Sequence, residues 1–295
     1  MQNKEDDNEL KDFVFGDKYI PVSDIACERQ RANTATDGIE FKLESGEGFV
    51  WERLRITTKD GAASVGRPIG RYDTLNLGAI HLLCESDTDD VKNEISKELC
   101  ALISELNLFP DRILVVGLGN EKLTPDSVGP KCAALIHATR HISFFGETES
   151  EIPEYSEIAC IAPGVSQDSG IESFEIISGL ISRIKPDFII AVDSIATASA
   201  QRLGKCIQIS DTGIAPGSGV GGRRMLLNEK TLGVPVIAIG APTVINSRLL
   251  DTHKSDSDSK VTEDELFLSP REIDLITDAF ADVIAGAINQ AFGIF

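Results

Sequence analysis

The sequence lacks any apolar run that approaches the ~20 residues needed to cross a bilayer. It also lacks a recognisable secretory signal, because its first residues, MQNKEDDNELKD, are acidic and polar. We therefore expect a cytoplasmic protein without a membrane partner.

Sequence patterns for metal or disulfide chemistry are absent. The six cysteines include no Cys-x-x-Cys pair, which is typical of buried free thiols in a reducing compartment. The four histidines show no His-Glu-x-x-His spacing. The sequence encodes no local zinc site, and we expect neither a metal nor another cofactor.

Positive charge is scarce. The chain carries 28 Lys and Arg against 47 Asp and Glu, for a formal net charge of −19. Nucleic-acid binding depends on Lys and Arg that neutralise phosphates, so direct nucleic-acid binding is not expected. A basic protein partner would fit this charge, although solubility is the simpler interpretation. The length of 295 residues suffices for a substantial core.

From residue 112 onward, apolar runs of strand length alternate with helical patterns. Near-continuous apolar strands separated by helices are typical of a mostly parallel sheet sandwiched by helices. We therefore predict an α/β fold of the phosphorylase/hydrolase-like kind. The expected strands are 113–118, 158–162, 188–193, 206–209 and 236–239, and the expected helices are 127–139, 170–184 and 194–203.

The region before residue 112 predicts a β-rich extension over 25–80, because residues 49–57 alternate in the manner of a half-buried strand. Residues 20–28 fit an edge strand or a loop. Residues 87–106 have the apolar spacing of an amphipathic helix with an N-cap among Asp87, Thr88 and Asp89.

Near the other end of the chain, the acidic segment 251–266 predicts a flexible surface loop. A helix is then expected to begin with Ser269 as its N-cap, Pro270 in its first turn and Glu272 at the capping-box position.

Two carboxylates stand out beside the ends of expected strands. Asp126 follows the turn 117–120, and Asp193 ends an apolar run. Ligands of open parallel sheets bind outside the carboxyl ends of the strands, so we expect both side chains to face one cleft. One carboxylate would activate water while the other protonates or polarises a scissile carbonyl. Alternatively, each residue caps a helix, Asp193 one that begins at Ser194.

Two glycine-rich turns and one cationic pair have open interpretations. The turn 117–120 lacks the third glycine of a dinucleotide site, which favours a tight structural turn. The loop 213–224 offers backbone N–H groups to an anion or an extended peptide, or is a flexible connection. Arg140 and His141 end an expected helix, where cations are favourable.

Longer motifs follow one another in a fixed order over most of the chain. They include Thr124–Pro130, Gly170–Glu175, Ala191–Asp193, Gln208–Ile214 and Pro216–Gly221. This set resembles the germination protease family of endospore-forming bacteria, whose fold is similar to that of hydrogenase-maturation endopeptidases. The resemblance implies an endopeptidase of the forespore or spore core. It would degrade small acid-soluble spore proteins at germination, after synthesis as a zymogen, and would form a homotetramer.

The resemblance also implies roles for particular residues. Asp126 and Asp193 match the family's proposed catalytic aspartates. The segment Ser23–Glu28 is similar to the family's cleavage motif, which implies autoprocessing between Asp24 and Ile25. This cleavage would release a propeptide, 1–24, and leave a single peptidase domain, 25–295. The candidate substrate-binding residues are Arg140, His141, Gly217, Ser218 and Gly219.

Two alternatives to this peptidase remain open. One is a metal-dependent maturation-type endopeptidase that uses the two aspartates as ligands, although no third ligand is evident in the sequence. The other is a non-catalytic protein that keeps the fold and binds peptides.

Overall fold

The computed structural model describes residues 23–30, 37–46, 49–145, 156–217, 225–247 and 266–293. Most of the expected propeptide, residues 1–22, lies outside the described residues. The same holds for Ser218 and Gly219 and for nearly all of the acidic segment, residues 251–265.

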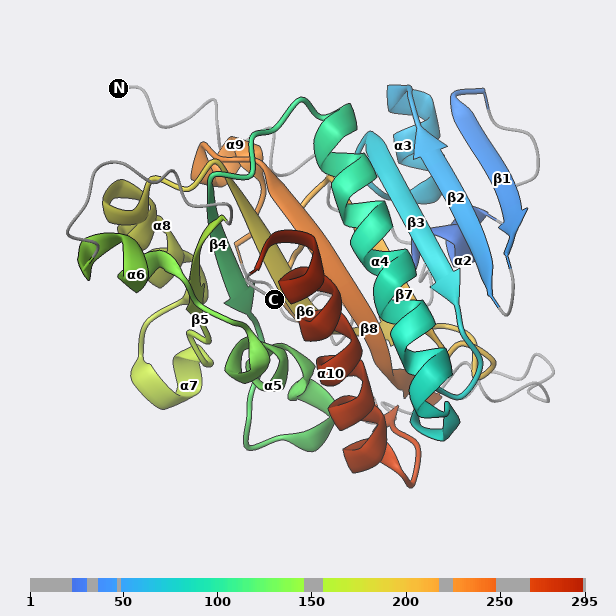
Figure 1. Cartoon of the computed structure of the whole chain (residues 1–295). Helices are drawn as coiled ribbons and strands as arrows, with labels where there is room; N and C mark the ends of the chain where they lie inside the picture. Colours follow the sequence, from blue (N-terminus) through green and yellow to red (C-terminus); the bar gives the residue numbers. More distant parts are fainter. Residues whose placement is uncertain are drawn as a thin grey trace, which may run out of the picture.

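One mixed sheet of nine strands forms the centre of the molecule (Figure 1). The strand order is β1-β2-β3-β7-β8-β6-β4-β5, and β9 pairs with β8. The strands β8, β6, β4 and β5 are parallel, and all other pairs are antiparallel. The α/β fold is confirmed, with the parallel pairing confined to this half of the sheet. The strands are β1 (Ile39–Ser45), β2 (Val50–Ile56), β3 (Gly70–Asn76), β4 (Arg112–Gly117), β5 (Glu157–Ile161), β6 (Phe188–Thr197), β7 (Cys206–Ser210), β8 (Val236–Asn246) and β9 (Phe267–Leu268).

Helices cover both faces of this sheet (Figure 1). One face packs against α4, α5 and α10, and the opposite face packs against α8 and, near β2 and β3, against α2 and α3. Within the described residues, no helix is long and apolar enough to cross a membrane. The helices are α2 (Ala26–Gln30), α3 (Lys59–Val65), α4 (Glu85–Glu105), α5 (Val128–Leu135), α6 (Arg140–Phe145), α7 (Ser166–Ser169), α8 (Ser173–Ile184), α9 (Glu229–Leu232) and α10 (Ile273–Phe292), with short turns η2 (Ile80–Leu82) and η3 (Thr124–Asp126).

Strand alternation decides which side chains can reach the site. On β6, Ile190 and Val192 pack into the core beneath α4 and α10, whereas Ala191 packs on the opposite face. Successive side chains of a strand point to opposite faces, so Asp193 projects on the same side as Ala191. On β7, Gln208 likewise projects away from α10, because its neighbours on both sides belong to the core beneath that helix.

The prediction of a helix over 194–203 is wrong. The strand β6 continues through this region to Thr197, which pairs with Ile245 of β8. Parallel pairing with β8 extends along the whole segment and outweighs its helical pattern. Asp193 therefore lies inside a strand and does not cap a helix.

Three other boundaries differ from expectation. The helix α4 has Cys84 at its N-cap, and α10 has Glu272, in place of the residues expected from capping patterns. The helix expected over 127–139 ends early, because α5 stops at Leu135. The Thr139 hydroxyl accepts a bond from the Ile158 amide and holds the following chain against β5, and a separate helix, α6, begins after it. Arg140 therefore begins a helix and does not end one.

The segment 20–28 also differs from the expected edge strand or loop. Its described part turns at Ser23 and enters α2 at Ala26. The Ser23 hydroxyl accepts a hydrogen bond from the Ile25 amide at 3.2 Å, which closes the turn before the helix.

A buried ion cluster joins β2 and β3 to α4. Three arginines face four carboxylates in this cluster, and Asp73 is among the most buried of them, with only 2% of its side chain exposed. Burial raises the pKa of the Asp73 carboxyl from 3.8 to about 6, although the adjacent Arg71 guanidinium acts in the opposite direction. The cluster consists of Arg53, Arg55, Arg71, Glu44, Asp73, Glu98 and Glu105.

The raised pKa of Asp73 predicts how stability depends on pH. Between about pH 4 and 6 the folded carboxyl binds more protons than the unfolded one, so its contribution to the unfolding free energy falls as pH rises. We expect the difference in unfolding free energy between wild type and Asp73→Asn to fall by up to ~1.4 kcal/mol per pH unit in this window. Urea unfolding at several pH values measures it. The exposed Asp90→Asn is the control, and a pH-independent difference for Asp73→Asn would contradict the prediction.

Candidate active site

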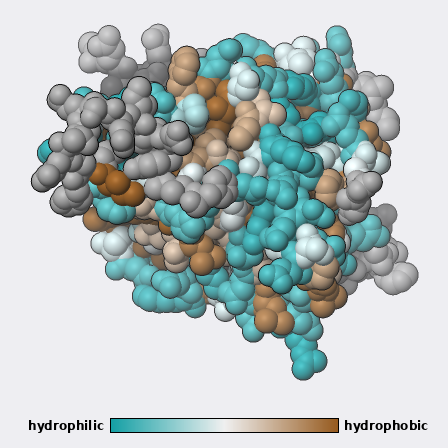
Figure 2. Space-filling model, viewed as in Figure 1, coloured by the Kyte–Doolittle hydropathy of each residue, from teal (hydrophilic) through white to brown (hydrophobic). Residues whose placement is uncertain are grey.

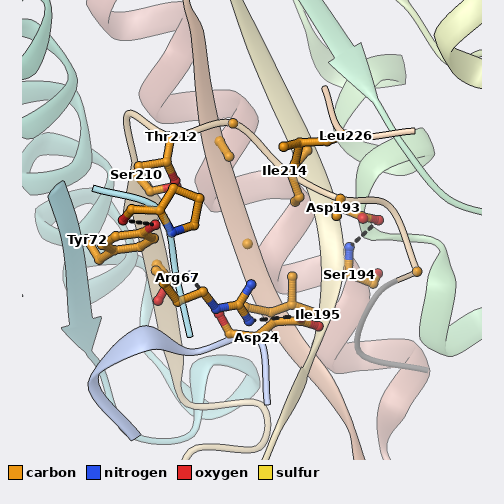
Figure 3. A pocket seen from close by; sticks show the side chains of 17 residues that line it. Asp24, Arg67, Tyr72, Asp193, Ser194, Ile195, Ser210, Thr212, Ile214 and Leu226 are labelled. Atoms are coloured by element: carbon orange, nitrogen blue, oxygen red, sulfur yellow. Dashed lines mark hydrogen bonds and ion pairs between the residues drawn. The ribbon is translucent and has the colours of Figure 1, made fainter. Parts of the chain in front are cut away.

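A cleft opens on the face of the sheet opposite α4 and α10, beside β6, β7 and β8 (Figure 3). The cavity within it is small, about 70 Å³, and the space between its walls reaches about 590 Å³ only when the adjoining open solvent is included. Strands supply its floor, and the described N-terminal segment supplies one wall. Among the lining residues are Asp24, Arg67, Tyr72, Asp193, Gln208 and Gly217.

Asp193 lies in the strand that forms part of this floor. Its side chain is buried, with 3% of the residue exposed, and Oδ1 accepts a hydrogen bond from the Ser194 amide at 2.9 Å. The neighbouring strand places Gly240 beside Asp193 in the register of β6 and β8. The side chain of Ile195 lies over Gly240 and fills the space next to this glycine.

Asp126 lies at the end of the adjacent strand, β4, in the short turn η3. Its Oδ2 accepts a hydrogen bond from the Asn120 amide at 2.9 Å. The Val128 amide, two residues further on, donates to Ser194 Oγ at 3.4 Å and ties this turn to β6. The turn that carries Asp126 therefore lies next to the part of β6 that carries Asp193, although Asp126 is not among the residues that line the cleft.

The glycine turn before Asp126 has a steric reason. Gly119 has φ of 116°, and a Cβ atom there would lie 2.1 Å from the Asp126 carbonyl oxygen. The close approach of two backbone segments thus requires glycine. This geometry agrees with the interpretation of a tight structural turn.

The segment that contains the expected cleavage site is bound along the edge of the cleft. The Asp24 amide donates to the Ala196 carbonyl at 2.8 Å, and Asp24 Oδ2 accepts from the Ala196 amide at 2.9 Å. Arg67 extends toward the same residue in Figure 3 and donates to the Ser23 carbonyl at 2.7 Å and to Asp24 Oδ1 at 3.2 Å. The Asp24–Ile25 bond is thereby held against β6 at Ala196, three residues along that strand from Asp193.

Gln208 bonds the same segment on both sides of Ile25. Its Nε2 donates to the Asp24 carbonyl at 3.1 Å, and its Oε1 accepts from the Ala26 amide at 2.8 Å. The Ile25 side chain is fully buried. These contacts hold the peptide bond in one orientation.

The acidic end of the segment is bound separately. Glu28 accepts hydrogen bonds from Thr197 Oγ1 at 2.6 Å and from the Ala198 amide at 2.7 Å. The Arg202 guanidinium lies 3.5 Å from the same carboxylate. Both acidic residues of the motif, Asp24 and Glu28, thus have an arginine partner.

The other candidate substrate-binding residues are separated. Gly217 lines the cleft. Arg140 and His141 lie at the start of α6, which packs near β5, and neither lines the cleft.

Sequence reasoning missed Arg67 and Gln208. One available signal was the isolated polar side chain of Gln208 between two isoleucines in a strand. No local pattern distinguishes Arg67.

Thiol chemistry has little support at this site. Burial raises the pKa of the Cys27 thiol to about 12, so the cysteine beside the bound segment stays protonated near neutral pH. In the part of the chain that the structure describes, no three His, Cys, Asp or Glu side chains cluster as a metal site would require.

Comparison with solved structures finds a [NiFe] hydrogenase maturation protease, HycI, from Thermococcus kodakarensis. It is 20% identical, covers 61% of this chain and 93% of its own, and has a TM-score of 0.34. This similarity is too low to carry an argument about function.

Comparison with known sequences gives a much closer relation. A germination protease family model matches residues 20–257. Germination protease of Caldanaerobacter subterraneus subsp. tengcongensis is 36% identical over 91% of this chain and 93% of the relative. The Clostridium perfringens protein is 33% identical over 92% and 95%, and the Bacillus subtilis protein is 39% identical over 78% and 64%. The chain therefore belongs to the germination protease family and is a peptidase.

Proposed function

We propose that the chain is an endopeptidase that begins the degradation of small acid-soluble spore proteins at germination. The observation that carries this proposal is the binding of an Asp-Ile peptide bond in the cleft that Asp193 lines. The family gives the peptidase activity, and the bound segment suggests the kind of substrate. It is a peptide with an acidic residue before the cleaved bond and a second one four residues later.

The proposed chemistry is hydrolysis by carboxylate-activated water. One aspartate takes a proton from water as the oxygen attacks the scissile carbonyl, and the other assists proton transfer to the leaving nitrogen. Asp193 and Asp126 are our candidates, because the turn that carries Asp126 is tied to β6 at Ser194, the residue after Asp193. This mechanism corresponds to an aspartic-type peptidase.

The function is tested by incubating the purified chain with a small acid-soluble spore protein and following cleavage by mass spectrometry. We expect internal cuts on the carboxyl side of acidic residues. If no such protein is cleaved under any condition, the peptide-binding alternative is favoured. Loss of activity with a chelator, and its return with added metal, would favour the metal-dependent alternative.

We further propose that the chain is a zymogen that cuts itself between Asp24 and Ile25. The position of this bond beside the cleft supports the proposal, since Asp24 and Asp193 line the same space. Cleavage would release residues 1–24. Homotetramer assembly and location in the forespore belong to the same proposal, and light scattering of the purified chain tests the first.

Autoprocessing predicts a defined product. Incubation at mildly acidic pH is expected to yield a chain that begins at Ile25. Asp24→Asn should slow this conversion about tenfold, because it removes a charge-assisted bond with Arg67. Mass spectrometry and sequencing of the new N-terminus measure both results.

A matched control is Asp60→Asn on α3, the helix that precedes Arg67, because Asp60 is exposed. Its conversion rate should equal that of wild type. A product beginning at any other residue, or no conversion, would refute the proposed cleavage.

A further inference from the structure

We propose that Gln208 is a further catalytic residue, whose side-chain amide stabilises the oxyanion that forms on the scissile carbonyl. This inference rests on the proposed function and takes Asp24–Ile25 as the bond that is cut. It assigns a role to a buried, uncharged side chain that touches the reacting carbonyl directly.

The two hydrogen bonds of Gln208 fix the direction of its amide. A backbone N–H can only donate, so the Ala26 amide requires Gln208 Oε1 to face it, at 2.8 Å. The Nε2 group must then face the Asp24 carbonyl oxygen, at 3.1 Å. The donor is thereby aimed at the atom that gains negative charge when water attacks.

The sheet places Gln208 opposite the proposed acid–base group. Gln208 pairs with Gly240 across β7 and β8, and Asp193 pairs with Gly240 across β8 and β6. Neighbouring strands lie about 4.8 Å apart, so the two backbones are roughly 10 Å apart with a glycine between them. The side chain of Ile195 lies over Gly240 between them, and Gln208 reaches the Asp24 carbonyl from the β7 side.

The surroundings of this donor strengthen its effect. Gln208 is 8% exposed, and Ile25, Cys27, Ile195 and Cys206 form an apolar cluster beside it. A hydrogen bond to an oxyanion is worth more in such an environment than in water. A neutral amide also supplies it without burying another charge.

The proposed hydrolysis has two stages, attack of water and release of the amine. Water oxygen bonds to the Asp24 carbonyl carbon, a carboxylate takes the water proton, and the carbonyl π electrons move to oxygen. The oxyanion accepts the Nε2–H bond of Gln208. When the carbonyl re-forms, the carbon–nitrogen bond to Ile25 breaks and the nitrogen receives a proton, which gives a new carboxyl group and a new amine.

The test compares Gln208→Glu and Gln208→Met in the full chain, with the first-order rate of Asp24–Ile25 cleavage as the readout. Near pH 7 we expect both variants to be slower by ~10²–10³-fold, the usual effect of losing one oxyanion donor. As pH falls toward about 5, the carboxyl introduced by Gln208→Glu protonates and can donate again. The deficit of Gln208→Glu relative to wild type should then shrink at least tenfold, whereas that of Gln208→Met should not.

Gln208→Glu keeps an oxygen acceptor for the Ala26 amide, so hydrogen exchange of that amide at pH 7 reports whether the segment stays bound. If the slowed Gln208→Glu variant also loses protection of this amide, the side chain only positions the segment, and this outcome would overturn the inference. Wild-type rates in either variant would also overturn it. The methionine variant is uncharged and close in volume, so it keeps the test valid if the glutamate variant does not fold.

A matched control is Gln290→Glu on α10, where Gln290 bonds Asn93 of α4. Its rate should equal the wild-type rate at every pH. If the wild-type chain itself never cuts the bond but cleaves spore proteins, autoprocessing and this inference fail together while the peptidase function stands. Normal cleavage with unaffected Gln208 variants refutes only the role of Gln208.

Discussion

Asp193→Asn is expected to lower peptide-bond hydrolysis by ~10³-fold or more. A positioned general acid or base contributes about 10²–10⁴-fold to a rate, and an amide cannot take a proton from water. The substitution preserves side-chain shape, and its oxygen can still accept the Ser194 amide that now bonds Oδ1. The measurement is kcat for a small acid-soluble spore protein, alongside the thermal unfolding temperature.

Asp126→Asn should have a comparable effect on kcat if both carboxylates act in catalysis. Because Asp126 also accepts the Asn120 amide in its turn, its unfolding temperature must be measured in parallel. The control is Asp278→Asn, since this carboxylate is 65% exposed on α10 and pairs with Lys131. We expect the control to stay within about twofold of wild type. Wild-type rates in both Asp126→Asn and Asp193→Asn would refute the carboxylate pair.

Gly129→Ala is expected to destabilise the fold by about 3 kcal/mol or more. A Cβ atom at this position would lie 2.1 Å from the Leu118 carbonyl oxygen and 2.6 Å from that of Val192. Both atoms are backbone, and the two residues are joined by the Leu118 amide bond to Val192 at 2.8 Å. Relief of the clash would push α5, and with it the turn η3 that carries Asp126, away from β6, which carries Asp193. Urea unfolding measures the loss.

A second glycine provides the control for this prediction. Gly179 lies in α8, and a Cβ atom there would meet nothing within 4 Å. Gly179→Ala should therefore stabilise the chain by ~0.5–1 kcal/mol through the higher helix propensity of alanine. Equal effects at the two positions would mean that the close approach of α5 to the strand ends is not required.

The face of the molecule shown in Figure 2 is largely polar. Its apolar residues are scattered, and no single apolar region covers this face. The net charge of −19 agrees with that surface. Recognition of the bound segment at the cleft instead uses largely buried arginines. Arg67 and Arg202 have 19% and 8% of their side chains exposed.

Several elements could be predicted from the sequence because their signal is local. The core strands β4, β5 and β7 begin within one residue of expectation, since continuous apolar runs suit a strand that is covered on both faces. The helix α4 also follows from its apolar spacing. The motif order alone indicated the family, which the relatives confirm.

Predictions failed where distant partners decide the structure. Residues 194–197 fit a helix by pattern, but β8 runs beside them and extends β6. Capping patterns placed one helix start among Asp87, Thr88 and Asp89 and the other at Ser269, whereas α4 and α10, which pack against each other and the sheet, begin after Cys84 and Glu272.

The sequence by itself determined the α/β class, the family and the two aspartates that merit mutation, because these depend on residue order and local periodicity. Only the tertiary structure decided that Asp193 lies within a strand, beside Gly240 of β8. It also placed Gln208 at a carbonyl 184 residues away in the chain. Such contacts depend on strand order and register, because these bring remote residues onto one face of the sheet. No local sequence pattern encodes strand order or register.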